Sequence, residues 1–251
     1  MQPKISIITI TFNAQQYLED TIKSVISQTY PHIEYLIVDG QSTDGTLAII
    51  EKYAHHITQW ISEPDNGIAD AMNKGLTLAT GDFILFLHAD DYLLHEHSIA
   101  EAVQLMRGNF YIFAFTVFFK IKMGEVCVKP RSLNSYTRFK IPFCHQGVLC
   151  HQQLFREIGV FDTNFKIDMD YDFFLRAYRR QYQAKTIDYT VAVMRDTGIS
   201  SRRDWQSLRQ RFAEERAIHF KNCANLFERF VYHGYWILYL PYRWLRAKLL
   251  D

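Results

Sequence analysis

The sequence predicts an α/β domain with a mostly parallel central sheet over residues 1–201, followed by a helical tail over residues 202–251. Apolar runs rich in β-branched residues alternate with segments of helical periodicity, as parallel βαβ units require. Polar clusters follow several of these runs directly, and the composition becomes basic and aromatic in the tail.

The first strand is predicted at 4–10, a β-branched apolar run typical of a buried strand. A helix follows, with apolar residues on one face at Tyr17, Leu18, Ile22, Val25 and Ile26. Further strands are predicted at 33–38, 58–62 and 83–87. Helical stripes separate them, formed by Leu47, Ile50 and Tyr53 and then by Ala71, Met72, Leu76 and Leu78.

The order of predicted strands and helices changes in the second half of the domain. Two strand-like runs lie between Phe110 and Val128, around Met123-Gly124. Helices are predicted near 152–158 and after Asp172, and another strand at 186–194. The tail is predicted to be helical and to break at Pro241.

Composition excludes several classes of protein. The 251 residues are 48% hydrophobic and 22% charged, as in an ordinary globular domain, and the net charge of +1 argues against nucleic acid as a partner. The four cysteines are scattered without zinc-site spacing, which favours a reducing compartment. With no signal-peptide pattern and no apolar run of about 20 residues, we expect a cytoplasmic protein.

Polar side chains gather where the predicted strands end. They are Asn13, Asp39, Glu63 with Asp65, and Asp90 with Asp91. Because ligands of parallel α/β sheets bind beyond the carboxyl ends of the strands, these clusters predict one binding site.

Two of the clusters suggest particular ligands, and each has a plainer explanation. Asp90 and Asp91 suit Mg²⁺ or Mn²⁺, but could simply cap the next helix. Asp39 could accept hydrogen bonds from a nucleotide, or belong to a turn with an N-cap at Ser42 or Asp44.

The segment from Glu63 to Gly75 is the densest of these clusters. Asp70 and Lys74 lie one helical turn apart and could pair with each other. Asn73 and Gly75 have no obvious packing role in an ordinary helix.

Taken together, these motifs resemble glycosyltransferase family 2 in residue type, order and spacing. The resemblance covers roughly residues 4–200 and is carried by Thr11-Phe12-Asn13, Val38 to Thr46, Ser62 to Gly75, Gly81-Asp82 and Leu87 to Asp91. It implies a Rossmann-like GT-A fold and is closest in character to members that build bacterial surface polysaccharides.

The resemblance also implies roles for single residues. Thr11 and Asn13 would lie near the base of the nucleotide, and Asp39 would hold the uracil or ribose. The donor pocket would be lined by Asp65 and Lys74. Asp90 would be the metal-binding carboxylate of the DxD motif, with Asp91 beside it and with His88 in place of the first aspartate.

On the acceptor side, Asp168 to Asp172 resembles the acidic motif of the family. Asp170 would then be the catalytic base, Met169 replaces the usual glutamate, and Asp172 is the nearest alternative base. His145 and Gln146 resemble the segment beside the acceptor. In the loop that follows the last strand, Arg202 or Arg203 could contact phosphate or be a solvated turn.

The implied reaction is a metal-dependent, inverting single displacement. The donor would be a nucleotide-diphosphate sugar, with UDP favoured, and the acceptor a hydroxyl of a glycan or lipid-linked glycan. The alternatives are a pyrophosphorylase-like enzyme and a catalytically inactive binding or scaffold protein of the same fold. Thr11-Phe12-Asn13-Ala14 lacks the glycine-rich phosphate loop usual in nucleotidyltransferases.

The tail from Phe227 to Leu250 mixes many aromatic side chains with Arg229, Arg243, Arg246 and Lys248. Such a composition is typical of a segment that lies on a membrane surface, here the inner face of the cell membrane. It suits equally a helical hairpin packed on the domain or in a homodimer interface.

Overall fold

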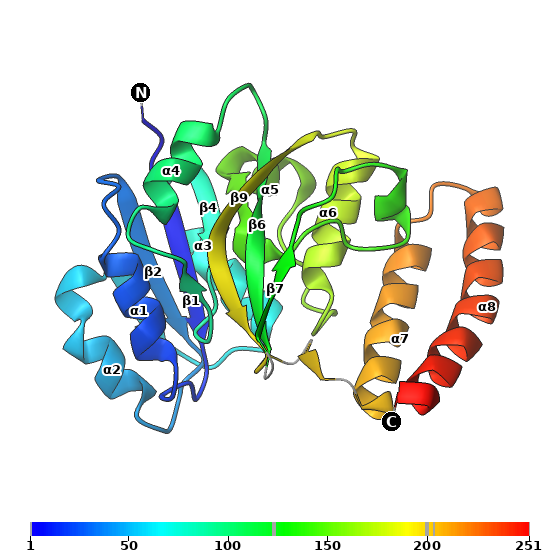
Figure 1. Ribbon diagram of the computed structural model, residues 1–251, viewed down its shortest axis with the longest axis horizontal. Coiled ribbons are helices and arrows are strands. Elements are labelled where there is room, and N and C mark those ends of the chain that lie inside the picture. The colour runs from blue at the N-terminus through cyan, green and yellow to red at the C-terminus, as the bar shows by residue number, and fades with distance from the viewer. Residues whose placement is uncertain (1, 122–123, 199–200, 203, 251) are drawn as a thin grey trace.

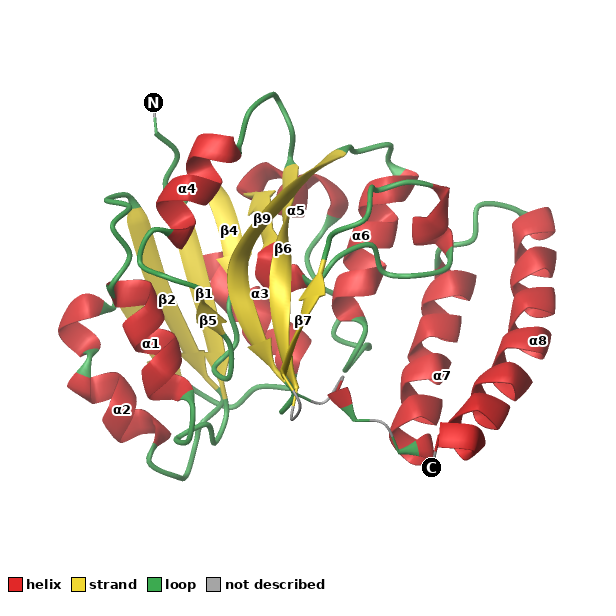
Figure 2. Ribbon diagram, in the orientation of Figure 1, coloured by secondary structure: helices red, strands yellow, loops and turns green. Residues whose placement is uncertain are grey.

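The computed structural model describes residues 2–121, 124–198, 201–202 and 204–250. Helices cover both faces of a central sheet, and a helical hairpin stands at one end of the molecule (Figures 1 and 2). The strands are β1 (Ile5–Thr11), β2 (Ile33–Asp39), β3 (Gln59–Ser62), β4 (Phe83–Phe86), β5 (Tyr92–Leu93), β6 (Ile112–Ile121), β7 (Gly124–Val128), β8 (Val148–His151) and β9 (Ala184–Arg195). The helices are α1 (Leu18–Ile26), α2 (Thr46–Lys52), α3 (Ile68–Leu78), α4 (Ser98–Leu105), α5 (Gln152–Ile158), α6 (Met169–Arg179), α7 (Trp205–Lys221) and α8 (Leu226–Leu250).

The sheet has the strand order β3-β2-β1-β4-β8-β6-β9-β5, and β7 pairs with β6. Strands β1 to β4 are parallel to one another, as the βαβ alternation predicted. The second half is mixed, since β8 runs antiparallel to both β4 and β6 while β6 and β9 are parallel. The predicted GT-A type of architecture, with a helical region at the C-terminus, is confirmed.

Most of the predicted elements of the first half are found within one or two residues. Strand β8, the two-residue β5 and helix α4 were not predicted. Strand β8 passes directly into α5 without a turn, so no break in the sequence separates its four residues from the helix.

The predicted break at Pro241 is wrong, because α8 continues through it. A proline removes one helical hydrogen bond, here the one to the carbonyl of Ile237. Both residues lie on the exposed side of α8, where water can satisfy that carbonyl. Among the described residues, no helix combines the length and the apolar character that crossing a bilayer requires.

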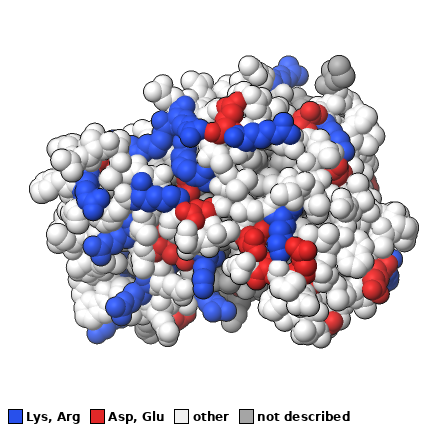
Figure 3. Space-filling view, turned by 180° about the vertical axis from the view of Figure 1, so that it is seen from behind, with Lys and Arg blue, Asp and Glu red and all other residues white. Residues whose placement is uncertain are grey.

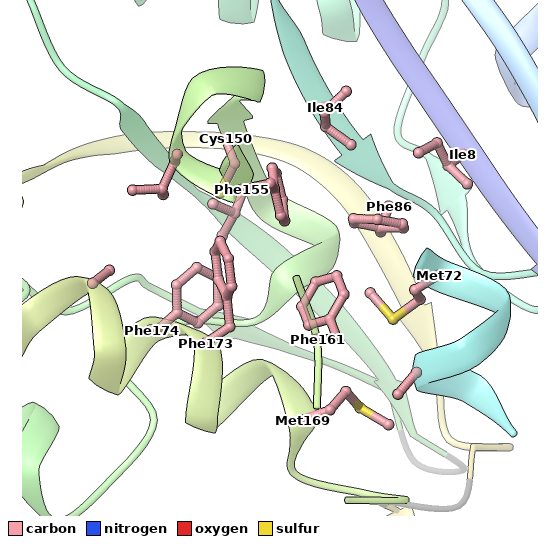
Figure 4. Close-up of a cluster of buried hydrophobic side chains, with 14 of the residues drawn as sticks. Ile8, Met72, Ile84, Phe86, Cys150, Phe155, Phe161, Met169, Phe173 and Phe174 are labelled. Atoms are coloured by element: carbon pink, nitrogen blue, oxygen red, sulfur yellow. The ribbon is translucent and has the colours of Figure 1, made fainter. Parts of the chain in front are cut away.

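Buried apolar side chains form one cluster on each face of the sheet and a third between α7 and α8. Figure 4 shows part of the first cluster, where Phe86 faces Phe155 and Phe161. Met169, at the start of α6, belongs to this cluster and is 3% exposed. The sheet and its flanking helices are therefore fixed by packing directly beneath the polar strand ends.

Asn73 and Gly75 do have packing roles, contrary to the expectation from sequence. The Asn73 side chain donates to the carbonyl of Phe161 and accepts from its N–H, at 2.9 and 3.0 Å. A Cβ on Gly75 would meet Ile8 Cγ2 at 2.5 Å and Val38 Cγ2 at 3.6 Å. Helix α3 therefore approaches the sheet as closely as it does because position 75 has no side chain.

We expect Gly75→Val to lower the free energy of unfolding by about 2–3 kcal/mol, because the added atoms overpack the contact between α3 and β1. The matched control Thr77→Val, exposed on the same helix, should change it by less than about 0.5 kcal/mol. Urea unfolding of both variants checks this, and equal effects would contradict the proposed contact.

Candidate functional site

The strand ends predicted from sequence do meet at one edge of the sheet. Thr11 and Asp39 are directly paired at the ends of β1 and β2, and the Gly40 N–H donates to the Thr11 carbonyl at 2.9 Å. The Thr11 hydroxyl is buried and has no hydrogen-bond partner in the described structure. A buried hydroxyl without a partner is uncommon, and it marks this edge as a place where a ligand atom could bind.

Asp39 is fully buried and holds the neighbouring loops together. Its carboxylate accepts from the Ser42 N–H at 2.9 Å and from the Ser62 hydroxyl at 2.7 Å, and the Ser42 hydroxyl donates to it as well. The Ser42 hydroxyl in turn accepts from the Asn13 N–H at 2.8 Å. Asp39 thus shapes the edge of the site through two serines, with few lone pairs left for a ligand.

Asn13 adopts a left-handed backbone conformation with φ of 49°, which asparagine tolerates better than most residues. This conformation lets its side-chain oxygen accept from the Thr43 N–H at 2.9 Å. The preceding Phe12 is 63% exposed, although it is large and apolar. An exposed aromatic ring at this edge offers a flat surface to the base of a nucleotide.

Asp65 lies against Gly40. A Cβ on Gly40 would collide with the Asp65 carboxylate, so only glycine leaves room for this contact. Lys74 reaches back from α3 to the same loop, at 2.9 Å from Glu63 and 2.6 Å from the Pro64 carbonyl. Its predicted partner Asp70 is 3.9 Å away, and the hydrogen bond to Glu63 raises the pKa of Lys74.

Asp90 and Asp91 follow β4 but turn in different directions. Asp90 is partly exposed, and its carboxylate accepts from the Thr197 hydroxyl at 2.6 Å. Asp91 is 2% exposed and accepts from the Gln146 side chain at 2.9 Å and from the Arg195 N–H at 3.1 Å. Burial, followed by the charge of Asp90, raises the pKa of Asp91 well above its ordinary value.

A metal at this edge would therefore have to rely on Asp90. Within the described ranges, no three His, Cys, Asp or Glu side chains are grouped as a metal site. One protein carboxylate nevertheless fits Mg²⁺ or Mn²⁺ bound together with a diphosphate, because these ions retain several positions for phosphate oxygens and water. The contacts of Asp91 with Gln146 and Arg195 give it a supporting position instead.

Asp170 is the end of a chain of side chains that begins at His88. His145 Nδ1 lies 3.0 Å from Asp170 Oδ2, and His145 Nε2 lies 2.8 Å from His88 Nε2. The other Asp170 oxygen accepts from the Tyr171 N–H at 2.8 Å. With Asp170 ionised, a proton on His145 Nδ1 and one on His88 Nε2 satisfy both contacts.

The neutral form of His88 agrees with this arrangement. Burial, with a smaller effect from His145, lowers the pKa of His88 well below its ordinary value. His88 thus has a specific partner in His145. Through His145, it connects the segment after β4 to the start of α6.

Asp170 and His145 line a cavity of about 630 Å³ between the sheet and the C-terminal hairpin. Its cationic side chains come from the C-terminal region and are Arg202, Arg211, Arg243 and Arg246. Its carboxylates are Asp168, Asp170 and Asp196. A volume of this size accommodates part of a sugar or glycan chain beside the Asp170 carboxylate.

The profile of the family described as Glycosyl transferase family 2 matches residues 6–187. This chain belongs to that family. An uncharacterized glycosyltransferase of Mycobacterium tuberculosis is 33% identical over 207 residues, covering 80% of this chain and 79% of that one. A PGL/p-HBAD biosynthesis glycosyltransferase of Mycobacterium bovis is 33% identical over 188 residues, covering 70% of both chains.

Solved structures agree on the fold of this glycosyltransferase. The mannosyltransferase PcManGT from Pyrobaculum calidifontis, in complex with GDP-Man and Mn²⁺, has a TM-score of 0.71 at 18% identity, covering 99% of this chain and 74% of that one. Residues 1–349 of S. aureus TarS in complex with UDP give 0.66 at 20% identity, covering 87% and 65%. The chain spans 39% of the longer TarS chain.

Asp172, the alternative base, has a structural position in this glycosyltransferase. Asp172 is fully buried and pairs with Arg176 at 2.8 Å and with Lys221 at 2.9 Å, which ties α6 to α7. Met169 points into the core. Asp170 is therefore the acid of this helix that both lines the cavity and contacts His145.

Sequence reasoning missed several residues that hold the site together. Arg195 donates to the Asp90 carbonyl at 2.7 Å and reaches Asp20 at 2.7 Å, while Thr197 contacts Asp90. These contacts arise because β9 pairs with β5, the strand that begins directly after Asp91. No local pattern in the sequence reveals this pairing. In the loop after the last strand, where Arg202 or Arg203 was predicted to contact phosphate, residues 199, 200 and 203 lie outside the described residues.

Proposed function

We propose that this family 2 glycosyltransferase moves a sugar from a nucleotide-diphosphate sugar to a hydroxyl of a glycan or lipid-linked glycan. The proposed setting is bacterial polysaccharide biosynthesis, and UDP is the first nucleotide to test. The observation that carries the proposal is the chain of contacts from His88, two residues before Asp90, through His145 to Asp170 in the cavity.

On the donor side, we assign the nucleotide to the edge formed by Thr11, Asn13, Asp39 and Asp65, with Lys74 beside it. The buried Thr11 hydroxyl without a partner supports this assignment. The UDP in the TarS structure and the GDP-Man in the PcManGT structure support a nucleotide-sugar donor for a chain of this fold. Asp39 would act mainly through the Ser42 and Ser62 loops that its carboxylate holds.

We assign the divalent metal, Mg²⁺ or Mn²⁺, to Asp90. When bound, it would offset the negative charge that develops on the departing nucleoside diphosphate. Arg195 and Thr197 hold Asp90 in place from β9 and the residues after it. The Mn²⁺ in the PcManGT structure supports this cofactor class.

On the acceptor side, Asp170 would take the proton of the attacking hydroxyl. Its two oxygens are fixed by His145 and by the Tyr171 N–H, so its orientation in the cavity does not depend on the acceptor. The proposed step is a single displacement that inverts the anomeric carbon. Burial raises the pKa of Cys144 beside the cavity to about 12, which agrees with a site that uses no thiolate nucleophile.

Calorimetric titration with UDP, GDP and dTDP, each with Mn²⁺ and with EDTA, tests the donor side. We expect one nucleotide to bind in Mn²⁺ and to lose about tenfold or more of its affinity in EDTA, since Asp90 would hold a metal that offsets the charge of the diphosphate. Binding of no nucleotide under either condition, together with no sugar transfer, would contradict the proposal and favour an inactive scaffold.

A further inference from the structure

Helix α8 lies at one end of the molecule (Figure 1), and it carries a stripe of exposed apolar side chains. The stripe consists of Leu226, Phe227, Phe230, Ile237, Leu238, Trp244 and Leu245, and five of these side chains are more than 70% exposed. At 100° per residue they fall within an arc of about 120°, along a length of about 29 Å. Isolated exposed apolar residues are common, but seven of them on one side of a single helix indicate a surface that binds something.

The opposite face of α8 already supplies the packing that the fold needs. Tyr232 and Trp236 are buried against α7, and Trp236 donates to His219 at 3.0 Å. Tyr232 donates to the Arg138 carbonyl at 3.0 Å. The hairpin is therefore packed on the domain, and α8 has two apolar faces of which one is covered. A Cβ on Gly234, within the exposed arc, would meet nothing within 4 Å.

The charges around the stripe discriminate between a membrane and a second copy of the chain. Of the basic residues of α8, Arg229, Arg246 and Lys248 are exposed, whereas Arg243 lies over the Phe212 ring of α7 at 4.9 Å. Its acid, Glu228, is 3% exposed and is held by Arg138 and Arg179 at 2.9 and 2.6 Å. Two copies paired through this face would bring basic side chains together with no exposed carboxylate of α8 between them.

An anionic lipid surface supplies the negative charge that a second copy of α8 does not offer. Figure 3 shows more Lys and Arg than Asp and Glu at the left end of that view, which is the end that α7 and α8 form. Lys248 lies over the Trp244 ring at 4.2 Å, so an aromatic ring and a cation are paired beside the stripe. A helix with an apolar face bordered by basic and aromatic residues is the kind that lies in a lipid interface.

We propose that α8 docks this glycosyltransferase on an anionic membrane surface. The apolar stripe enters the headgroup region, and the basic side chains face lipid phosphates. Arg243 and Arg246 line the cavity that holds Asp170 from the other side of α8, so that cavity lies on the side of the helix away from the docked stripe. The docking itself does not depend on the reaction proposed above.

Vesicle sedimentation of the full chain tests this inference. We expect binding to vesicles of phosphatidylcholine mixed with phosphatidylglycerol, weaker binding to phosphatidylcholine alone, and loss of binding as salt rises. The triple variant Phe230→Ser, Ile237→Ser, Leu238→Ser should have an affinity for anionic vesicles that is lower by about tenfold or more. A matched triple variant, Leu105→Ser, Val126→Ser, Val160→Ser, removes exposed apolar side chains outside α8 and should bind as the parent does.

Circular dichroism and nucleotide titration of both variants show whether they fold and keep this test independent of the donor site. Should the α8 triple variant fail to fold, Arg229→Gln with Lys248→Gln takes its place and should weaken binding to the anionic vesicles only. Absence of binding by the parent chain, or equal binding by the α8 variants, would overturn the proposal. So would a dimer, detected by light scattering, that dissociates in the α8 triple variant while vesicles have no effect.

Discussion

Replacing Asp90 with alanine is expected to abolish both sugar transfer and the metal dependence of nucleotide binding. Asp91 is buried against Gln146 and Arg195, so Asp90 is the carboxylate after β4 that remains available to a metal. Without it, the charge on the leaving diphosphate would lose its main counter-charge, which is worth several kcal/mol. Transfer should fall by about 10³-fold or more.

The measurement pairs a transfer assay with nucleotide calorimetry in Mn²⁺ and in EDTA. Asp82→Ala is the matched control, because Asp82 lies at the opposite end of β4, where it accepts from the Lys4 N–H at 2.8 Å. It should leave nucleotide binding unchanged. Intact Mn²⁺-dependent binding in Asp90→Ala would remove the metal from this residue.

The second large effect is expected for Asp170→Asn. The amide has the shape of the carboxylate and keeps an oxygen for the Tyr171 N–H, but it cannot take a proton. Transfer should fall by about 10²-fold or more, while donor affinity stays within about twofold, because only the acceptor step requires a base. Initial rates at saturating donor and nucleotide titration together separate the two effects.

Asp172→Asn provides the contrast on the same helix. Asp172 pairs with Arg176 and Lys221 beneath the surface, so its neutralisation should reduce stability by about 3 kcal/mol rather than remove the base. Thermal unfolding measures that loss. A parallel loss of donor binding and transfer in Asp170→Asn would instead place Asp170 among the structural residues.

The first half of the fold could be predicted from the sequence because its information is local. Each strand from β1 to β4 is an apolar run followed by its own polar cluster, and parallel strands bring such clusters to one edge. The candidate residues Asn13, Asp39 and Asp90 follow from that rule, whereas Thr11 became a candidate through the family resemblance. Strand β8 could not be predicted, since it is short and runs directly into a helix.

The links within the site could not be predicted for a different reason. His88 and His145 are 57 residues apart, and Arg195 reaches Asp90 across 105 residues. Such contacts depend on how the mixed half of the sheet folds back on the parallel half. The tail shows the same limit, because its composition suited a packed hairpin and a membrane face equally, and α8 has one side packed on α7 and one exposed apolar side.

The contact between His88 and His145 also limits how this glycosyltransferase can change over evolution. An aspartate at position 88 would place a carboxylate where the His88 ring now contacts Nε2 of His145. His145 would then have a carboxylate on each side, and its neutral ring, which has one N–H, could not donate to both. Positions 88 and 145 are therefore expected to change together among relatives, so that one ancestral substitution would require the other.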